Sequence, residues 1–179
     1  GTERDGVWKA TQYGSQWARI SAGMVPRRIN QIAQTLTGSH TLYAGTSAGL
    51  YQSKDGGATW VNEGNTVNPR DVTALATHTK TDLIVYYGTR DGQVYRTYSG
   101  GDVFFECWPG VGEEIRNLAV APYFTIYAVT STGKSFSSDD DGHTFYPMGD
   151  LANEHAMAIA IDPVRPWIAY AATRTNGVF

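Results

Sequence analysis

The chain has 179 residues, of which 41% are hydrophobic, 12% aromatic and 17% charged, and its formal net charge at pH 7 is -3. This length predicts a single domain, and the low charged fraction with 20 glycines favours an all-β protein rich in tight turns. The acidic balance, with Arg27-Arg28 as the longest basic run, argues against nucleic acid as a partner. No apolar stretch reaches the roughly 18 residues of a membrane-spanning helix, so membrane insertion is not expected.

A glycine followed by apolar or aromatic residues recurs along the chain at intervals of 43, 43, 41 and 44 residues. These glycines are Gly6, Gly49, Gly92, Gly133 and Gly177. A tyrosine followed three residues later by threonine has the same period, at Tyr43, Tyr86, Tyr127 and Tyr170. Two independent markers at one period predict repeats of about 43 residues.

Each repeat contains four predicted strands, taken here in chain order. The first is short and apolar, as in strands buried on both faces, and spans residues 30–36, 71–77, 115–122 and 156–163. The second is rich in β-branched and aromatic residues, and spans residues 41–47, 83–90, 125–131 and 167–174. The third and fourth flank a turn, as GLYQS and ATWVN flank KDGG. Helix propensity is highest at Ala156–Ile161, but its place in the period predicts a strand.

Four strands in about 43 residues is typical of a β-propeller blade. We therefore predict an all-β fold in which residues 1–179 form one β-propeller domain of four-stranded antiparallel blades. Complete blades are expected at 28–64, 70–108 and 115–148, and partial blades at 1–20 and 156–179. Residues 6–20 either pair with 156–179 to close a four-blade ring, or the repeats belong to a larger ring, formed by a longer chain or by several copies as a homo-oligomer.

The turn SKDGGATW, residues 53–60, has residue types that stabilise a hairpin. Glycine adopts positive φ angles without strain, and an aspartate can accept hydrogen bonds from the turn. We expect hydroxyl bonds from Ser53 and Thr59, and an inward-facing Trp60. The full pattern is Ser53, Asp55, Gly57, Thr59 and Trp60. It recurs with phenylalanine last at Ser138, Asp140, Gly142, Thr144 and Phe145.

Weaker copies of this turn retain Gly14 with Trp17, and Gly101 with Phe104; Ser99 stands at the aspartate position of the latter. Trp17, Trp60 and the four repeated tyrosines are expected in the core. The spacing resembles the Asp-box, or BNR repeat, of sialidase-like, sortilin-like, xyloglucanase-like and photosystem II assembly propellers. The resemblance spans the whole chain. It implies that these hairpins lie on the outer rim, opposite the face that binds ligand.

Sialidase-like chemistry implies three arginines on a carboxylate, a tyrosine nucleophile with a glutamate, and an aspartic acid/base. No tyrosine and glutamate pair stands out at a strand end here. Xyloglucanase-like chemistry implies two aspartates on separate propeller domains, and 179 residues hold one domain. His155 beside Glu154 could act as a base, but nothing places a nucleophile beside it. No catalytic residue is therefore assigned.

Ligand binding is expected in the loops between blades and between second and third strands. Arg28, Arg70 and Arg116 lie at similar phases before first strands, which predicts that they face one funnel. The candidate ligand-binding residues are Arg28, Arg70, Arg90, Asp91, Arg116, Glu154, His155, Arg174 and Trp108.

We predict a non-catalytic recognition scaffold that binds a protein or a carbohydrate through inter-blade loops. The alternative is a glycoside hydrolase or a fragment of one. No cofactor is expected, and no metal, because adjacent side chains in Asp139–Asp141 would point to opposite faces of a strand. The single cysteine, Cys107, is expected to be a partly buried free thiol. The family resemblance implies a secreted or extracytoplasmic location.

Overall fold

The computed structural model describes residues 6–25, 28–63, 70–108, 110–151 and 154–179. Residues 1–5 of the first predicted partial blade, and residues 26–27, 64–69, 109 and 152–153, lie outside the described residues. Within the described chain the fold is all-β, as predicted, with two 3-10 turns, η1 (Gln12–Gly14) and η3 (Gly149–Leu151). No described helix is long or apolar enough to cross a membrane.

The described strands form three four-stranded antiparallel sheets and two two-stranded sheets. The first large sheet contains β3 (Ile29–Gln34), β4 (Leu42–Thr46), β5 (Gly49–Ser53) and β6 (Val61–Asn62). The second contains β7 (Val72–Thr77), β8 (Val85–Thr89), β9 (Val94–Thr97) and β10 (Phe105–Trp108). The third contains β11 (Ile115–Val120), β12 (Ile126–Thr130), β13 (Ser135–Ser138) and β14 (Tyr146–Pro147). The two-stranded sheets are β1 (Trp8–Thr11) with β2 (Gln16–Arg19), and β15 (Ala156–Ile161) with β16 (Ala169–Thr173).

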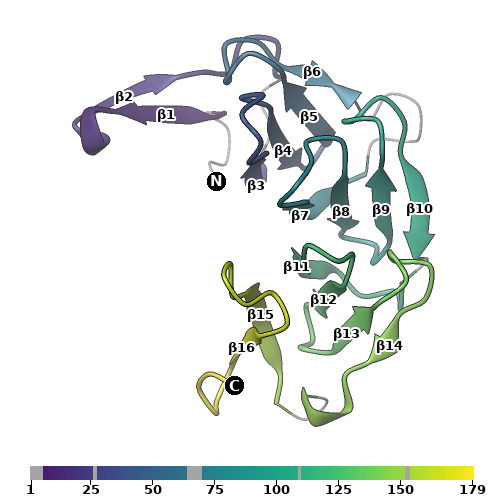
Figure 1. Cartoon of the computed structure of the whole chain (residues 1–179). Helices are drawn as coiled ribbons and strands as arrows, with labels where there is room; N and C mark the ends of the chain where they lie inside the picture. Colours follow the sequence, from purple (N-terminus) through teal and green to yellow (C-terminus); the bar gives the residue numbers. More distant parts are fainter. Residues whose placement is uncertain (1–5, 26–27, 64–69, 109, 152–153) are drawn as a thin grey trace.

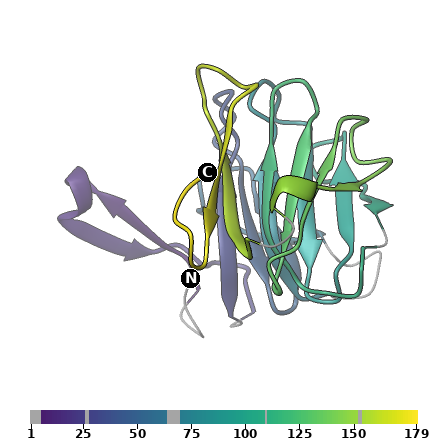
Figure 2. The same cartoon turned by 90° about the horizontal axis from the view of Figure 1, so that it is seen from below.

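The sheets stand around an arc, with β3, β7, β11 and β15 towards its inner side (Figure 1). Their strands run side by side, and the β1–β2 hairpin projects away from them (Figure 2). Because β1–β2 and β15–β16 belong to separate sheets, the pairing expected for a closed four-blade ring is not formed in this structure. The strand predicted over Ala156–Ile161 is confirmed as β15.

Two residues expected in the core are exposed. Trp17 on β2 is 62% exposed, because its hairpin projects from the arc, whereas Trp60 is 3% exposed. Tyr170 is 43% exposed, whereas the equivalent Tyr43 and Tyr86 are fully buried. The two buried tyrosines are covered by a turn of the following sheet, and no sheet follows β16 in the described chain.

Neighbouring sheets pack through one repeated pair of small and large residues. A Cβ built on Gly45 would lie 2.8 Å from Val72 Cγ1, and one on Gly88 would lie 2.5 Å from Ile115 Cγ2. The third junction lies between the third four-stranded sheet and β15–β16. There the larger residue is on the other side, because Val129 stands at the position of Gly45 and Ala156 at that of Val72, in one buried cluster. Glycine at the first two junctions therefore allows β4 and β8 to approach the next sheet closely.

The buried tyrosines also join neighbouring sheets by hydrogen bonds. Tyr43 Oη donates to the Gly100 carbonyl oxygen at 2.7 Å. Tyr86 Oη donates to the carboxylate of Asp141, in the equivalent turn of the third sheet. Burial raises the pKa of Tyr43 to about 12, so its phenol remains a donor at neutral pH. These two tyrosines thus fix the first sheet to a turn of the second, and the second sheet to a turn of the third.

The two complete Asp-box-like turns form the hydrogen bonds expected from the sequence. Ser53 Oγ donates to Asp55 Oδ1 at 2.7 Å, and the Thr59 amide donates to the same oxygen at 2.8 Å. Asp140 accepts the equivalent bonds from Ser138 and Thr144. Adjacent Asp141 instead accepts from Tyr86 and Tyr98, so the two carboxylates serve different partners.

These turns predict a loss of stability in acid. Hydrogen bonds from Thr59 and Ser53 lower the pKa of Asp55 to about 2, and those from Thr144 and Ser138 do the same for Asp140. A carboxyl whose pKa is lowered by folding stabilises the fold above about pH 4, its unfolded pKa, and loses that effect as pH falls towards 2. The thermal unfolding midpoint should therefore fall between pH 4 and pH 2. Asp55→Asn with Asp140→Asn should flatten that dependence, and an unchanged slope would contradict this role.

Candidate functional site

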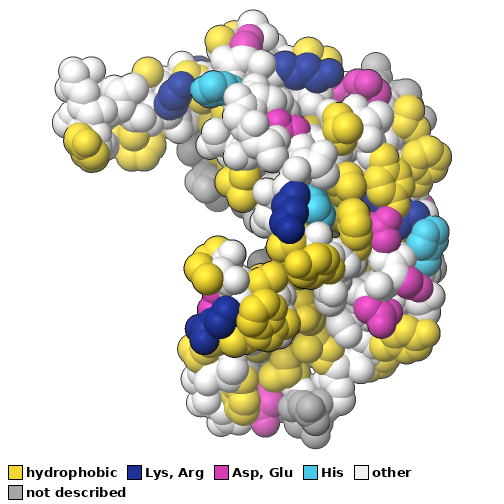
Figure 3. Space-filling view, viewed as in Figure 1, with side chains coloured by type: hydrophobic (Ala, Val, Ile, Leu, Met, Phe, Trp, Pro, Cys, Tyr) yellow, Lys and Arg dark blue, Asp and Glu magenta, His cyan; other side chains and the backbone are white. Residues whose placement is uncertain are grey.

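The strand registers place two sets of loops at one end of the sheets. Ile29 pairs with Thr46, and Val72 pairs with Thr89, so each first strand begins where the second strand ends. We call this end the loop face: it comprises the residues that precede the first strands and those that join second to third strands. The Asp-box-like turns follow the third strands and lie at the opposite end. Figure 3 shows that the side chains do not fill the inside of the arc.

A chain of ion pairs crosses the loop face and joins the three large sheets. Arg28 Nη2 lies 3.1 Å from Asp71 Oδ2. Arg90 contacts the same Asp71 oxygen through Nε, and its Nη1 lies 2.9 Å from Glu114 Oε2. Exposed pairs of this kind contribute little stability individually. Their effect here is to hold the charged side chains of neighbouring loops in fixed positions.

Arg28, Arg70 and Arg116 do not converge on one funnel as predicted. Arg70 Nη1 bonds to Asp91 and Gln93, and Arg116 Nη1 lies 3.7 Å from Met157 Sδ. The physical reason is phase: in the aligned repeats Arg70 precedes the Arg28 position by one residue and Arg116 follows it by two. Adjacent residues of an extended chain point to opposite faces, which separates Arg70 from Arg28. At Arg116 a β-bulge breaks this alternation.

Trp108 and Cys107 belong to the packing between the second and third sheets. The Trp108 ring stacks on Phe145 with centroids 4.5 Å apart and contacts Phe136 at 4.9 Å. Burial raises the pKa of the Cys107 thiol to about 12, and its Sγ donates to the Val94 carbonyl oxygen at 3.4 Å. The predicted partly buried thiol is thus a free cysteine of intermediate exposure in the structure.

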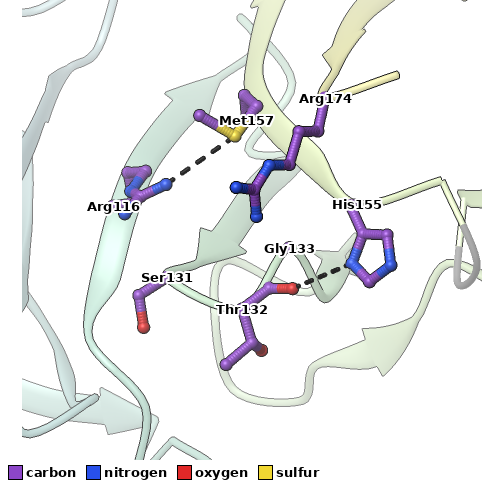
Figure 4. Close-up of a pocket in the computed structure, with 7 residues that line it drawn as sticks. All are labelled: Arg116, Ser131, Thr132, Gly133, His155, Met157 and Arg174. Atoms are coloured by element: carbon purple, nitrogen blue, oxygen red, sulfur yellow. Dashed lines mark hydrogen bonds between the residues drawn. The ribbon is translucent and has the colours of Figure 1, made fainter. Parts of the chain in front are cut away.

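Three predicted candidates, Arg116, His155 and Arg174, line one cavity of about 260 Å³ on the loop face, between the third sheet and β15–β16. Figure 4 shows the guanidinium groups of Arg116 and Arg174 extending from different sheets towards the same space. The lining residues are Arg116, Ser131, Thr132, Gly133, His155, Met157 and Arg174. We call this cavity the arginine pocket.

The backbone around the arginine pocket is shaped by a β-bulge and a glycine turn. The register shifts between Ile115 and Asn117, so Arg116 is the bulged residue, and a bulge redirects a side chain out of the strand pattern. Gly133 has φ +91°, and a Cβ there would lie 2.6 Å from His155 Cα. Only glycine at residue 133 therefore lets the His155 backbone pack against this turn.

His155 and the two nearby glutamates are already hydrogen-bonded. His155 Nδ1 lies 3.2 Å from the Thr132 carbonyl oxygen, which can only accept, so Nδ1 donates. Glu154 accepts from Asn176 Nδ2. Lys134 and Thr132 donate to Glu113 and lower its pKa to about 2.

Sequence reasoning did not identify Ser131, Thr132, Gly133 or Met157 as pocket residues. The alignment of repeats did contain a signal for this junction: the position occupied by Asp71 and Glu114 in two repeats is occupied by His155 in the next. A second cavity, of about 350 Å³, lies at the opposite end between Leu36, Pro122 and Ile161. Its one charged lining residue, Asp162, is paired with Arg165. The arginine pocket is therefore the better candidate.

No protein-family model and no curated protein matches this chain. Solved structures of β-propeller proteins do match it. An ancestral GH74 enzyme aligns at 18% identity and TM-score 0.75 over 96% of this chain and 25% of its own. The extracellular domain of a putative one component system from B. thetaiotaomicron aligns at 16% and 0.74 over 97% of this chain and 24% of its own. YCF48 bound to D1 peptide aligns at 14% and 0.65 over 92% of this chain and 54% of its own.

The chain thus spans about a quarter to a half of the length of these structures. At such identities the likeness concerns fold alone. The chain has the fold of a stretch of β-propeller: successive antiparallel four-stranded sheets arranged around an arc.

Proposed function

We propose that this chain is part of a non-catalytic recognition β-propeller that binds a partner through its loop face. The observation that carries the proposal is that the carboxyl groups named below are already hydrogen-bonded or ion-paired within the chain. Asp71, Asp91, Glu113, Glu114 and Glu154 are each held by arginine, lysine, hydroxyl or amide donors. A hydrolase needs a carboxylic acid with a raised pKa facing a second carboxylate across the substrate.

The pKa shifts support binding over acid/base catalysis. The pKa of Glu113 is lowered to about 2. Burial acts to raise the pKa of Asp91, but hydrogen bonds from Thr89 and Arg70 outweigh it, so the pKa is lowered. Burial raises the pKa of Glu63, but this residue follows β6, the outermost strand of the first sheet, and does not line the arginine pocket. A fixed array of ionised groups suits recognition.

The alternative function is a glycoside hydrolase fragment, and the likeness to an ancestral GH74 enzyme is the observation in its favour. The partner class that we favour is a protein, because YCF48 is a propeller of this kind bound to a peptide. Carbohydrate remains the second partner class. An extracytoplasmic location accords with the extracellular neighbour.

Two structural proposals accompany this function. We take residues 53–60 and 138–145 to be true Asp-boxes, supported by their hydrogen bonds. We also take the open arc to belong to a larger ring, completed by a longer chain or by further copies. Light scattering of the purified chain tests the second route: a dimer supports completion by copies, and a stable monomer at all concentrations contradicts it.

The function is tested by measuring binding and hydrolysis on the same preparation. The chain is applied to arrays of immobilised synthetic peptides and of β-glucan and xyloglucan oligosaccharides, and reducing-end release from soluble xyloglucan is measured in parallel. We expect retention on at least one array and no sugar release above a heat-denatured control. Release above that control would establish the hydrolase alternative, and absence of binding to both arrays would refute recognition.

A further inference from the structure

We infer that the arginine pocket binds a carboxylate group of an acidic peptide through the guanidinium groups of Arg116 and Arg174. This inference rests on the proposed recognition function and names its ligand class. It comes from comparing the three junctions between successive sheets, where equivalent positions carry different residues. The first two junctions are neutralised within the chain, and the third is not.

The residue before each first strand is an acid at two junctions and a histidine at the third. Asp71 binds Arg28 and Arg90, and Glu114 binds Arg90. His155 occupies the same position, since the Arg174 amide donates to its carbonyl oxygen at 3.1 Å just as the Arg90 amide donates to that of Asp71 at 2.9 Å. Arg174 therefore occupies the Arg90 position without the carboxylate that Arg90 finds in its own sheet.

The bulge residue of each first strand reaches the next sheet, and here too the third junction differs. Asn30 Nδ2 donates to Asp71 Oδ1 and to the Val72 carbonyl oxygen, both at 2.7 Å. Thr73 Oγ1 donates to the Ile115 carbonyl oxygen at 2.6 Å. Arg116 instead reaches the sulfur of Met157, at 3.7 Å, as its hydrogen-bond partner among the described residues. A thioether is a weak acceptor and does not neutralise a guanidinium.

Two guanidinium groups thus face one cavity without an acidic partner among the described residues. The neighbouring carboxylates do not supply one, because Glu113 is held by Lys134 and two threonines, and Glu154 accepts from Asn176. Like charges that share a small space repel each other, and a bound anion removes that repulsion. Guanidinium forks match the geometry of a carboxylate.

The lining favours a peptide carboxylate over a phosphate or an acidic sugar. Phosphate sites commonly use several free backbone N–H groups, whereas the amides of Ser131, Gly133 and Arg174 are bonded to carbonyl oxygens of this chain. Of the pocket's described lining residues, none is a phenylalanine, tyrosine or tryptophan that could stack on a sugar ring. Met157, 39% exposed, offers an adaptable apolar contact for a peptide side chain.

The test is calorimetric titration with an acetylated, amidated peptide that contains two adjacent glutamates, against the same peptide with glutamines. We expect the glutamate peptide to bind at least about tenfold more tightly, and Arg116→Gln or Arg174→Gln to weaken binding about tenfold. Arg165→Gln is the matched control, because Arg165 is an exposed arginine at the opposite end, paired with Asp162. It should leave affinity within about twofold. Urea unfolding midpoints verify that each variant is folded.

Each other outcome overturns the inference in a recognisable way. Equal binding of the glutamate and glutamine peptides, or binding that survives both arginine substitutions, places the site elsewhere and leaves the recognition function standing. Tighter binding of inorganic phosphate or of an oligogalacturonide, lost in both variants, overturns the peptide assignment. If no peptide or glycan binds to the wild-type chain at all, the recognition function fails with it.

Discussion

Replacing Gly88 by valine should lower the free energy of unfolding by about 1–3 kcal/mol, the usual cost of overpacking a core. A Cβ at this position would lie 2.5 Å from Ile115 Cγ2 and 2.6 Å from its Cβ. Ile115 is fully buried at the start of β11, so neither it nor the next sheet can move aside freely. Urea denaturation followed by circular dichroism measures the change, and Gly149→Ala is the control, because nothing lies within 4 Å of a Cβ there.

The same site offers a rescue experiment. Ile115→Ala alone should cost about 2–5 kcal/mol through the cavity that it leaves. Gly88→Val combined with Ile115→Ala reproduces the pair Val129 and Ala156, which fills the third junction. The double variant should therefore be at least about 1 kcal/mol more stable than the sum of the two single effects predicts. Strictly additive losses would show that these residues do not share a packing site.

Trp60→Ala should destabilise the fold by about 3–5 kcal/mol, the largest single effect that we expect. The side chain is 3% exposed in the cluster that contains Val7, Ile29 and Tyr51, and its Nε1 donates to the Ile20 carbonyl oxygen at 2.6 Å. The substitution therefore leaves both a large cavity and an unpaired carbonyl oxygen.

Trp17→Ala is the matched control, since Trp17 occupies the equivalent position of the first repeat but is 62% exposed. Its effect should stay within about 0.5 kcal/mol. Comparable losses for the two tryptophans would contradict the position of the β1–β2 hairpin, because they would require Trp17 to be packed as Trp60 is.

Periodicity was sufficient to predict the strands and their order. The tyrosine marker recurs once per sheet, and Tyr43 and Tyr86 each join their sheet to a turn of the next one. The helix-prone segment over Ala156–Ile161 forms a strand because its place in the repeat outweighs its local propensity. Burial at the ends was not predictable in this way: Trp17 and Tyr170 carry the core marker but are exposed, and each lies on a two-stranded sheet at an end of the arc.

The site was predicted only in part, for a physical reason. Sequence reasoning selected Arg116, His155 and Arg174, which line one pocket, but grouped Arg116 with Arg28 and Arg70, which bind elsewhere. A shift of one residue along an extended chain turns the Arg70 side chain to the other face, and the bulge at Arg116 breaks the alternation that would otherwise keep it on the Arg28 face. The charge balance of the pocket depends on which acids are already paired, and the three-dimensional structure is needed to identify those pairs.

We propose that a partner binds at the loop face, at the junction between the third sheet and β15–β16. Backbone amide chemical shifts during titration with the glutamate peptide test it most directly, in a protein of 19.5 kDa. We expect shifts concentrated at residues 131–133, 155–157 and 174. Shifts concentrated instead at the opposite end, around Gly57 and Gly142, would contradict it.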